Sequence, residues 1–167
     1  MIRNGFVISL MVVMGFMMGF PYQTNFFAFI AGLAVAMVFS YALSWIMATI
    51  GLAVKNPEAA QSAVFLPVFP LVFASSVFVP TQTMPAWLRA FAENQPITVT
   101  VNALRGLMLG PEALVDYQPG MTSGQLAQAV AEAPSVAGQV LLSLGWALAI
   151  MVVFVPLAIR VYRKTVS

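Results

Sequence analysis

The sequence predicts an all-α membrane protein with four transmembrane helices and two short external helices that re-enter or lie in the membrane interface. Composition is the first reason. Of the 167 residues, 61% are hydrophobic and 7% are charged, with a mean hydropathy of +0.94, whereas a soluble globular domain has roughly 25% charged residues. The second reason is that the apolar residues gather in four long runs with polar connections between them.

The four apolar runs predict the spans of a single membrane domain covering the whole chain. A spanning helix needs roughly 17–25 residues, so the first run is short and the second is longer than a straight crossing requires. Arg3 before the first run is typical of a signal peptide, but no small-residue cleavage site follows, so this run is predicted to be a span. The predicted spans are residues 5–20, 26–54, 63–80 and 138–159.

Loop charge predicts the orientation. Cytoplasmic loops of membrane proteins carry an excess of Lys and Arg. If both termini are cytoplasmic, five basic residues lie inside and two lie outside. The inside set is Arg3, Lys55, Arg160, Arg163 and Lys164, and the outside set is Arg89 and Arg105.

Two short amphipathic helices are predicted outside, at residues 83–95 and 97–109. In the first, Met84, Trp87, Leu88 and Phe91 follow i, i+3, i+4, i+7 spacing and form one apolar stripe. Thr83 is a candidate cap for its start, and Pro96 limits its end. The second is stopped by Gly110 and Pro111, and its apolar face is predicted to be Ile97, Val101, Leu104 and Met108.

Residues 110–137 are polar and rich in Gly and Pro, which predicts an external loop. Thr122 and Gln125 have the spacing of a capping box, so the loop is expected to contain one short helix that ends near Pro134.

The second span carries small residues every four positions. Small residues let helix backbones approach closely in lipid. This predicts a helix-packing face, either a static contact inside one subunit or a sliding contact near a conduit. Its central residues are Gly32, Ala36, Ser40 and Ser44.

Pro67 and Pro70 interrupt the third span, and each removes a backbone donor. They are candidate hinges for gating, or they form a fixed kink that helps a bundle to pack.

The residue types that are missing restrict the function. The chain has no Cys and no His, and it lacks a glycine-rich phosphate-binding loop of the GxxxxGK[ST] type. No ionisable residue lies centrally in a span, although ion-coupled transporters usually need one. We therefore expect no catalytic, cofactor-binding or metal-binding residue, and an enzyme is not expected. If the chain transports actively, a partner must supply the energy.

A long segment resembles a known family. "NPEAAQSAVFLPVFPLVFASSVFVPTQTMPAWLRAFAENQPITVTVNALRGLMLG" (residues 56–110) is similar to ABC-2 type permeases, and looks closest to the daunorubicin-resistance-type drug efflux permeases. The C-terminal "PLAIRVYRK" (residues 156–164) resembles the family's closing segment.

The resemblance implies six spans with two external re-entrant helices between the fifth and the sixth. The four predicted spans would be the third to sixth, so the chain looks truncated at its N-terminus, without the helices that touch the ATPase. The resemblance also implies a cytoplasmic ATP-binding subunit holding ATP and Mg, a second permease copy in a homodimer or heterodimer, and surrounding lipid of the bacterial inner membrane. No nucleic acid partner is expected.

The expected function is the permease subunit of an ATP-driven exporter of a hydrophobic or amphiphilic compound, as in drug efflux and antibiotic resistance. The alternative is a non-transporting membrane anchor, or a remnant of a degraded permease. The candidate gate and hinge residues are Pro67, Pro70, Trp87, Leu88 and Phe91, the last three as contacts of an external lid.

Overall fold

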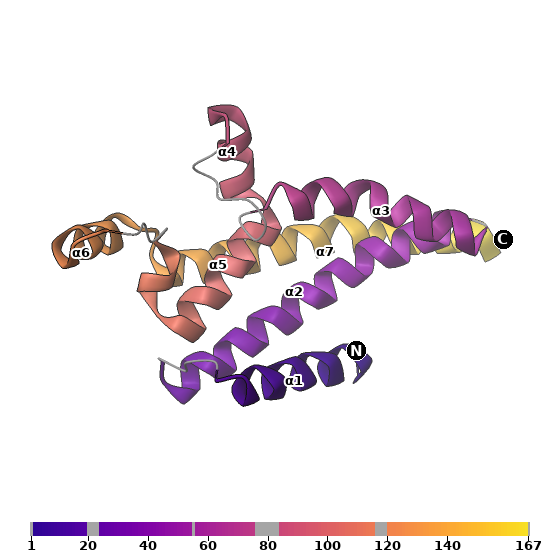
Figure 1. Ribbon diagram of the computed structural model, residues 1–167. Helices are drawn as coiled ribbons and strands as arrows, with labels where there is room; N and C mark the ends of the chain where they lie inside the picture. The colour runs from indigo at the N-terminus through magenta and orange to yellow at the C-terminus, as the bar shows by residue number, and fades with distance from the viewer. Residues whose placement is uncertain (1, 20–23, 55, 76–83, 116–119, 167) are drawn as a thin grey trace.

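The computed structural model describes the chain except for residues 1, 20–23, 55, 76–83, 116–119 and 167. All regular structure in the described residues is helical, which agrees with the predicted all-α class (Figure 1). The elements are α1 (Ile2–Met17), α2 (Phe26–Ala53), α3 (Pro57–Phe73), α4 (Ala86–Asn94), α5 (Pro96–Leu109), the short 3₁₀ helix η2 (Pro111–Leu114), α6 (Ser123–Glu132) and α7 (Val136–Val166).

Two of the described segments are long and apolar enough to cross a membrane, namely α2 and the stretch from Ser123 to Arg163 that includes α7. Only 22% and 17% of their most apolar windows are buried. Most of their apolar side chains therefore face outward, as contact with lipid requires. The core helix of a soluble protein would instead be mostly buried.

The other two predicted spans correspond to shorter helices, because α1 has 16 residues and α3 has 17. These lengths lie at or below the short end of the usual spanning range of about 17–25 residues. Parts of the two predictions, residue 20 and residues 76–80, lie outside the described residues. Length and composition thus support two of the four predicted spans.

Helix α3 begins earlier than the predicted span at residue 63. The Asn56 side chain accepts a hydrogen bond from the Glu58 backbone N–H at 3.0 Å, and Pro57 is in the first turn. An Asn cap followed by Pro is a strong helix start. The polar residues 57–62, which were predicted to be a connection, are therefore the first turns of the helix.

The predicted external segments are helical. Helix α5 ends at Leu109, where Gly110 has a φ of 94° that favours glycine. Helix α6 has the predicted capping box, with Thr122 and Gln125 bonded in both directions. Helix α4 starts after Pro85 without a side-chain cap, and the candidate cap Thr83 lies outside the described residues.

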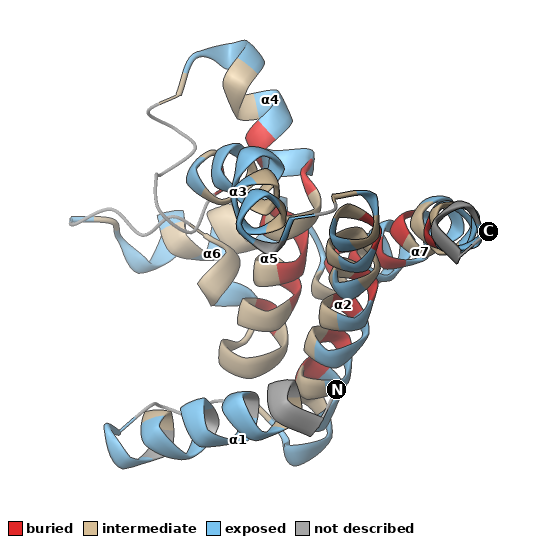
Figure 2. Ribbon diagram, turned by 90° about the vertical axis from the view of Figure 1, so that its right-hand side faces the viewer, coloured by how far each residue is buried: buried red, intermediate tan, exposed pale blue. Residues whose placement is uncertain are grey.

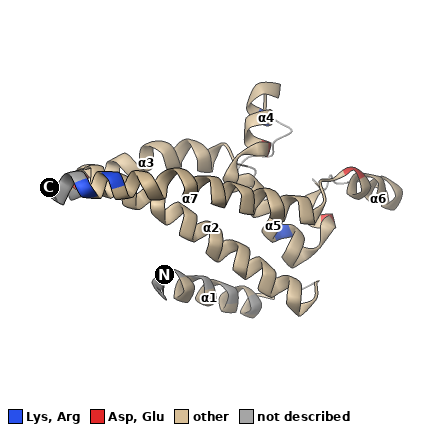
Figure 3. Cartoon of the chain, turned by 180° about the vertical axis from the view of Figure 1, so that it is seen from behind, with Lys and Arg blue, Asp and Glu red and all other residues tan. Residues whose placement is uncertain are grey.

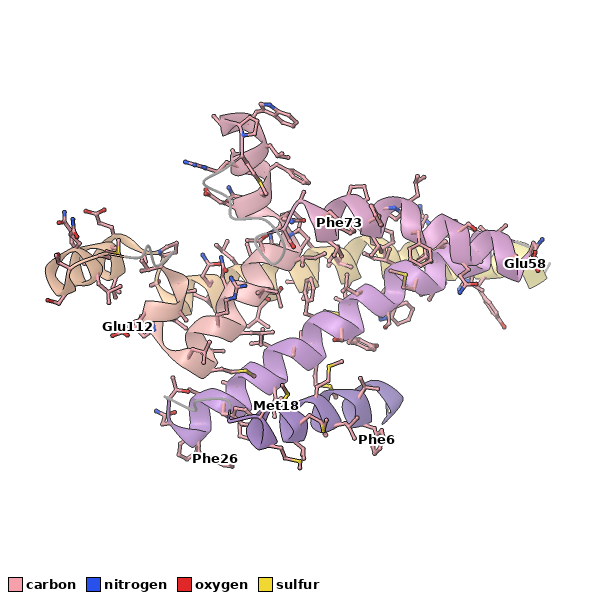
Figure 4. The ribbon with its side chains drawn as sticks, in the orientation of Figure 1. Phe6, Met18, Phe26, Glu58, Phe73 and Glu112 are labelled. Carbon is pink, nitrogen blue, oxygen red and sulfur yellow. The ribbon has the colours of Figure 1, made fainter. Side chains whose placement is uncertain are left out.

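The buried part of the molecule lies where α2, α5 and α7 face one another (Figure 2). Its apolar centre is formed by Phe39 and Ala42 of α2 with Ala147 and Ile150 of α7. By contrast, α1 presents many apolar side chains outward. Phe6 of α1, Met18 just after it and Phe26 at the start of α2 are 69%, 86% and 68% exposed (Figure 4).

Candidate functional site

Helix α5 is wedged between α2 and α7, and a buried hydroxyl pair joins it to α7. The side-chain oxygens of Thr100 and Ser143 are 2.8 Å apart. These residues are 4% and 1% exposed. Hydroxyl groups buried in this way need a partner, and each supplies one to the other.

The C-terminal end of α5 is joined to the start of α2. The Thr24 hydroxyl lies 2.7 Å from the Leu107 carbonyl oxygen and 3.1 Å from that of Met108, so it donates to the last turn of α5. Those carbonyls have no partner within the helix. Next to this contact, an ideal Cβ on Gly32 would be 3.2 Å from the Met108 methyl carbon, so glycine lets α2 approach α5 closely.

A second glycine brings α5 against the start of α7. An ideal Cβ on Gly106 would lie 2.7 Å from Cγ2 of Val136, closer than real side chains pack. Helix α5 is therefore held against the rest of the bundle by contacts with three residues: Thr24, Val136 and Ser143.

The buried face of α5 differs from the predicted one. The predicted apolar residues Ile97, Val101, Leu104 and Met108 are only half-buried. In lipid the hydrophobic effect does not drive helices together, so small and hydroxyl-bearing residues form the closest contacts, while Ile97 and Met108 pack at their edge. The residues that α5 buries are Thr98, Val99, Thr100, Ala103 and Gly106.

Helix α4 projects from the bundle, across the direction of α7 (Figures 1 and 2). It joins α5 through Gln95, which is 2% exposed and whose amide donates to the Thr98 hydroxyl at 3.3 Å. The Trp146 indole N–H of α7 donates to the Asn94 carbonyl at 3.1 Å. The base of α4 is thus attached to the bundle while the rest of the helix stands clear.

The predicted lid residues lie together on α4. Trp87 and Phe91 are 75% and 50% exposed, and Leu88 is half-buried. The buried residue of this helix is Ala92. The two aromatic residues of the predicted stripe therefore face outward, whereas Met84 and Leu88 are half-buried.

The predicted hinge residues lie on a different helix. Pro67 and Pro70 are both inside α3, which continues through them to Phe73, and both are exposed. The rings of Phe69 and Phe73 are 4.2 Å apart on the same helix. Because α3 packs mainly on α2 and α4 mainly on α5, the structure places the hinge and lid candidates in separate regions.

The line of contact on α2 departs from the predicted packing face. Gly32 is buried, Ala36 and Ser40 are half-buried, and Ser44 is exposed. With 3.6 residues per turn, each step of four advances about 40° around the helix, so a four-residue repeat leaves a straight contact line after two or three steps. Steps that alternate between three and four stay on the line, and the buried residues are Gly32, Val35, Phe39, Ala42 and Thr49.

Charged residues divide between the two ends of the bundle. Arg160 and Arg163 lie near the C-terminal end of α7, whereas Glu112 and Glu132 lie near η2 and α6 at the other end (Figure 3). The division by sign is incomplete, since Arg105 is on α5 near the acidic end and Glu58 starts α3 near the basic end (Figures 3 and 4). In the described residues no group of three or more acidic side chains could hold a metal ion.

A match to a family profile identifies the family of this chain. The profile of the ABC-2 type transporter family matches residues 3–109, more than half of the chain. The chain belongs to the ABC-2 type transporter family. The match confirms the resemblance inferred from residues 56–110 and takes in α2, α4 and α5.

One relative of this ABC-2 chain is the daunorubicin resistance ABC transporter permease protein DrrB1 of Streptomyces coeruleorubidus. It is 31% identical over 105 residues, which are 63% of this chain and 37% of the relative. The match thus spans little more than a third of the relative's length. No solved structure matches the ABC-2 chain significantly.

Proposed function

We propose that the chain is the membrane-spanning permease subunit of an ATP-driven exporter, and that it moves a hydrophobic or amphiphilic compound out of the cell. The observation that carries the proposal is membership of the ABC-2 type transporter family together with 31% identity to a daunorubicin-resistance permease. The exposed apolar faces of α1, α2 and α7 support a location in lipid.

The proposed topology has four spans, α1, α2, α3 and α7, with both termini in the cytoplasm of a bacterial cell. The basic end of α7, with Arg160 and Arg163, is the side that the positive-inside rule assigns to the cytoplasm. The opposite end, with Glu112 and α6, is then external. Figure 1 supports this alternation, since successive long helices run in opposite directions.

The proposed energy source is a cytoplasmic subunit that binds ATP and Mg, one for each of two permease copies that pair as a homodimer or heterodimer. The apolar windows of α2 and α7 contain no Asp, Glu, Lys, Arg or His in their sequence, which favours an external energy source over ion coupling. We propose that α5 acts as the fixed part of the outer end and α4 as its lid. Flexing of α3 at Pro67 and Pro70 would transmit the movement.

Affinity purification tests the partner. The tagged chain is extracted from its native membranes in mild detergent, and the eluate is assayed for ATP hydrolysis. An ATP-hydrolysing subunit that elutes with the chain supports the exporter. Elution without one overturns it in favour of the anchor.

A transport assay tests the direction. Daunorubicin is added outside inverted membrane vesicles with and without the chain, because a relative is named for resistance to it. Chain-dependent uptake that requires ATP supports export. Uptake that is equal in both preparations argues against daunorubicin-like cargo.

A further inference from the structure

We propose that the groove where the end of α4, the start of α5 and the outer part of α7 meet binds one acyl chain of a membrane lipid. The lipid belongs to the leaflet farther from Arg160 and Arg163. The groove encloses about 570 Å³. This inference requires only that α7 crosses the membrane, and it is independent of the proposed transport.

The body of the groove is apolar. Leu141 and Leu142 of α7 form one part of its lining and are 70% and 53% exposed. Val99 of α5, which is 2% exposed, closes the inner side. At Gly145 an added Cβ would have no neighbour within 4 Å, so the missing side chain leaves the groove open at this point.

Asn94 is a polar residue of the lining, and it is held in place at the level of Trp146. The Trp146 indole N–H donates to the Asn94 carbonyl at 3.1 Å, which fixes the ring beside the groove. The Asn94 side-chain amide donates to the Ala90 carbonyl at 2.9 Å and is exposed. A groove with this mainly apolar lining suits the apolar part of an amphiphile.

Position along α7 gives the depth of the groove. Ala149 and Leu141 line it and precede Arg160 by 11 and 19 residues. At a rise of 1.5 Å per residue, they lie about 16 and 28 Å from that arginine. With Arg160 at one surface of a hydrocarbon core of about 30 Å, both positions fall in the opposite leaflet.

The size of the groove favours a single chain over a second protein. It is lined by seven residues, whereas stable protein interfaces involve about 20–30 residues a side. The exposed leucines open it toward the surrounding lipid.

The test uses Trp146 as a reporter. A variant with Trp45→Phe and Trp87→Phe retains Trp146 as its single tryptophan. The delipidated protein in excess detergent is titrated with phosphatidylethanolamine brominated on its acyl chains, which quenches tryptophan on contact. Quenching is compared after Gly145→Leu, which fills the groove, and after Gly51→Leu. Gly51 lies in α2 and also has no neighbour within 4 Å of an added Cβ, so it is the matched control.

The proposal expects quenching that saturates at a low mole fraction of lipid. Gly145→Leu should raise the half-saturating fraction about tenfold or more, equivalent to 1.4 kcal/mol or more of binding free energy, and Gly51→Leu should leave it unchanged. The proposal is overturned if quenching rises in proportion to the lipid fraction, or if Gly145→Leu leaves the half-saturating fraction unchanged.

Native mass spectrometry gives a second readout on the chain with all its tryptophans. The chain should retain a bound lipid through detergent washing, and Gly145→Leu should lose it. Equal retention by both contradicts the proposal. Displacement of the lipid by added daunorubicin would reassign the groove to cargo, and a dimer that shields Trp146 from all brominated lipid would reassign it to a second copy. Either result overturns the lipid site.

Discussion

The hydroxyls of Thr100 and Ser143 lie 2.8 Å apart in a buried contact that joins α5 to α7. The two residues are 43 positions apart in the sequence. This pair connects α5, proposed to be external, to α7, which is long and apolar enough to cross a membrane. Together with the bond from Thr24 to the end of α5, it makes α5 part of the packed bundle. Helix α4, by contrast, projects from the bundle (Figure 1).

A disulfide tests whether α5 stays fixed during transport. The chain has no cysteine, so Thr100→Cys with Ser143→Cys introduces a single pair where two side-chain oxygens are already in contact. Mild oxidation should join the two cysteines. The rate of ATP-dependent export should be unchanged, because a helix that does not move relative to α7 during transport is not hindered by a cross-link to it.

The control for this experiment is Asn102→Cys with Ser143→Cys, because Asn102 is not on the buried face of α5. This pair should not cross-link. Export that stops on oxidation of the first pair and returns on reduction would show that α5 moves away from α7.

Substitution of Gly106 should reveal the close approach of α5 to α7. An added Cβ would be 2.7 Å from Cγ2 of Val136, and overpacking of this kind costs about 1–3 kcal/mol. Gly51→Ala gains the same helix propensity without a clash. Gly106→Ala should therefore be less stable than Gly51→Ala by about 1–3 kcal/mol in denaturant unfolding.

Val136→Ala removes both γ-carbons, so it should abolish most of the stability difference between Gly106→Ala and Gly51→Ala. If the difference persists in the Val136→Ala background, the contact with Val136 is not its cause.

Replacement of Pro67 and Pro70 by Ala should slow export severalfold while the amount of chain in the membrane stays the same. Each Ala restores a backbone donor inside α3 and straightens the helix, so any flexing there is lost. Both prolines are exposed, so little packing changes. Initial export rates and membrane abundance are the measurements. Pro156→Ala in α7 is the control for loss of a helix proline. Unchanged export in the Pro67 and Pro70 variant would reject the hinge.

Trp87→Ala should slow export with a change in stability of less than about 0.5 kcal/mol, because the side chain is 75% exposed. Ala92→Leu on the same helix should lower the stability substantially. Ala92 is fully buried, and overpacking costs about 1–3 kcal/mol. Detergent unfolding and vesicle export, measured together, distinguish the two. A large loss of stability in Trp87→Ala would show that α4 packs on the bundle through its aromatic stripe.

Local signals predicted the helix ends more reliably than the contacts. Gly110 ends α5 and the Thr122–Gln125 box starts α6, because each signal acts on backbone groups within a few residues. Asn56 followed by Pro57 is a local signal of the same kind, and it marks the start of α3, whereas apolarity by itself predicts a start at residue 63.

The contacts between helices could not be predicted in this way. The apolar stripe of α5 predicts the wrong packing face, because the helix packs through residues such as Thr98 and Ala103. Lipid removes the preference that makes an apolar stripe point inward. The partner of Thr100 lies 43 residues away, so no local pattern indicates it.

Gln95 ends α4 and, with φ of −72° and ψ of 152°, also begins α5. A connection of one residue contains no slack. The angle between α4 and α5 is therefore set by the two backbone dihedrals of a single residue, and that residue is 2% exposed. A change in those dihedrals would move Trp87, eight residues from Gln95, much farther than it would move Asn94.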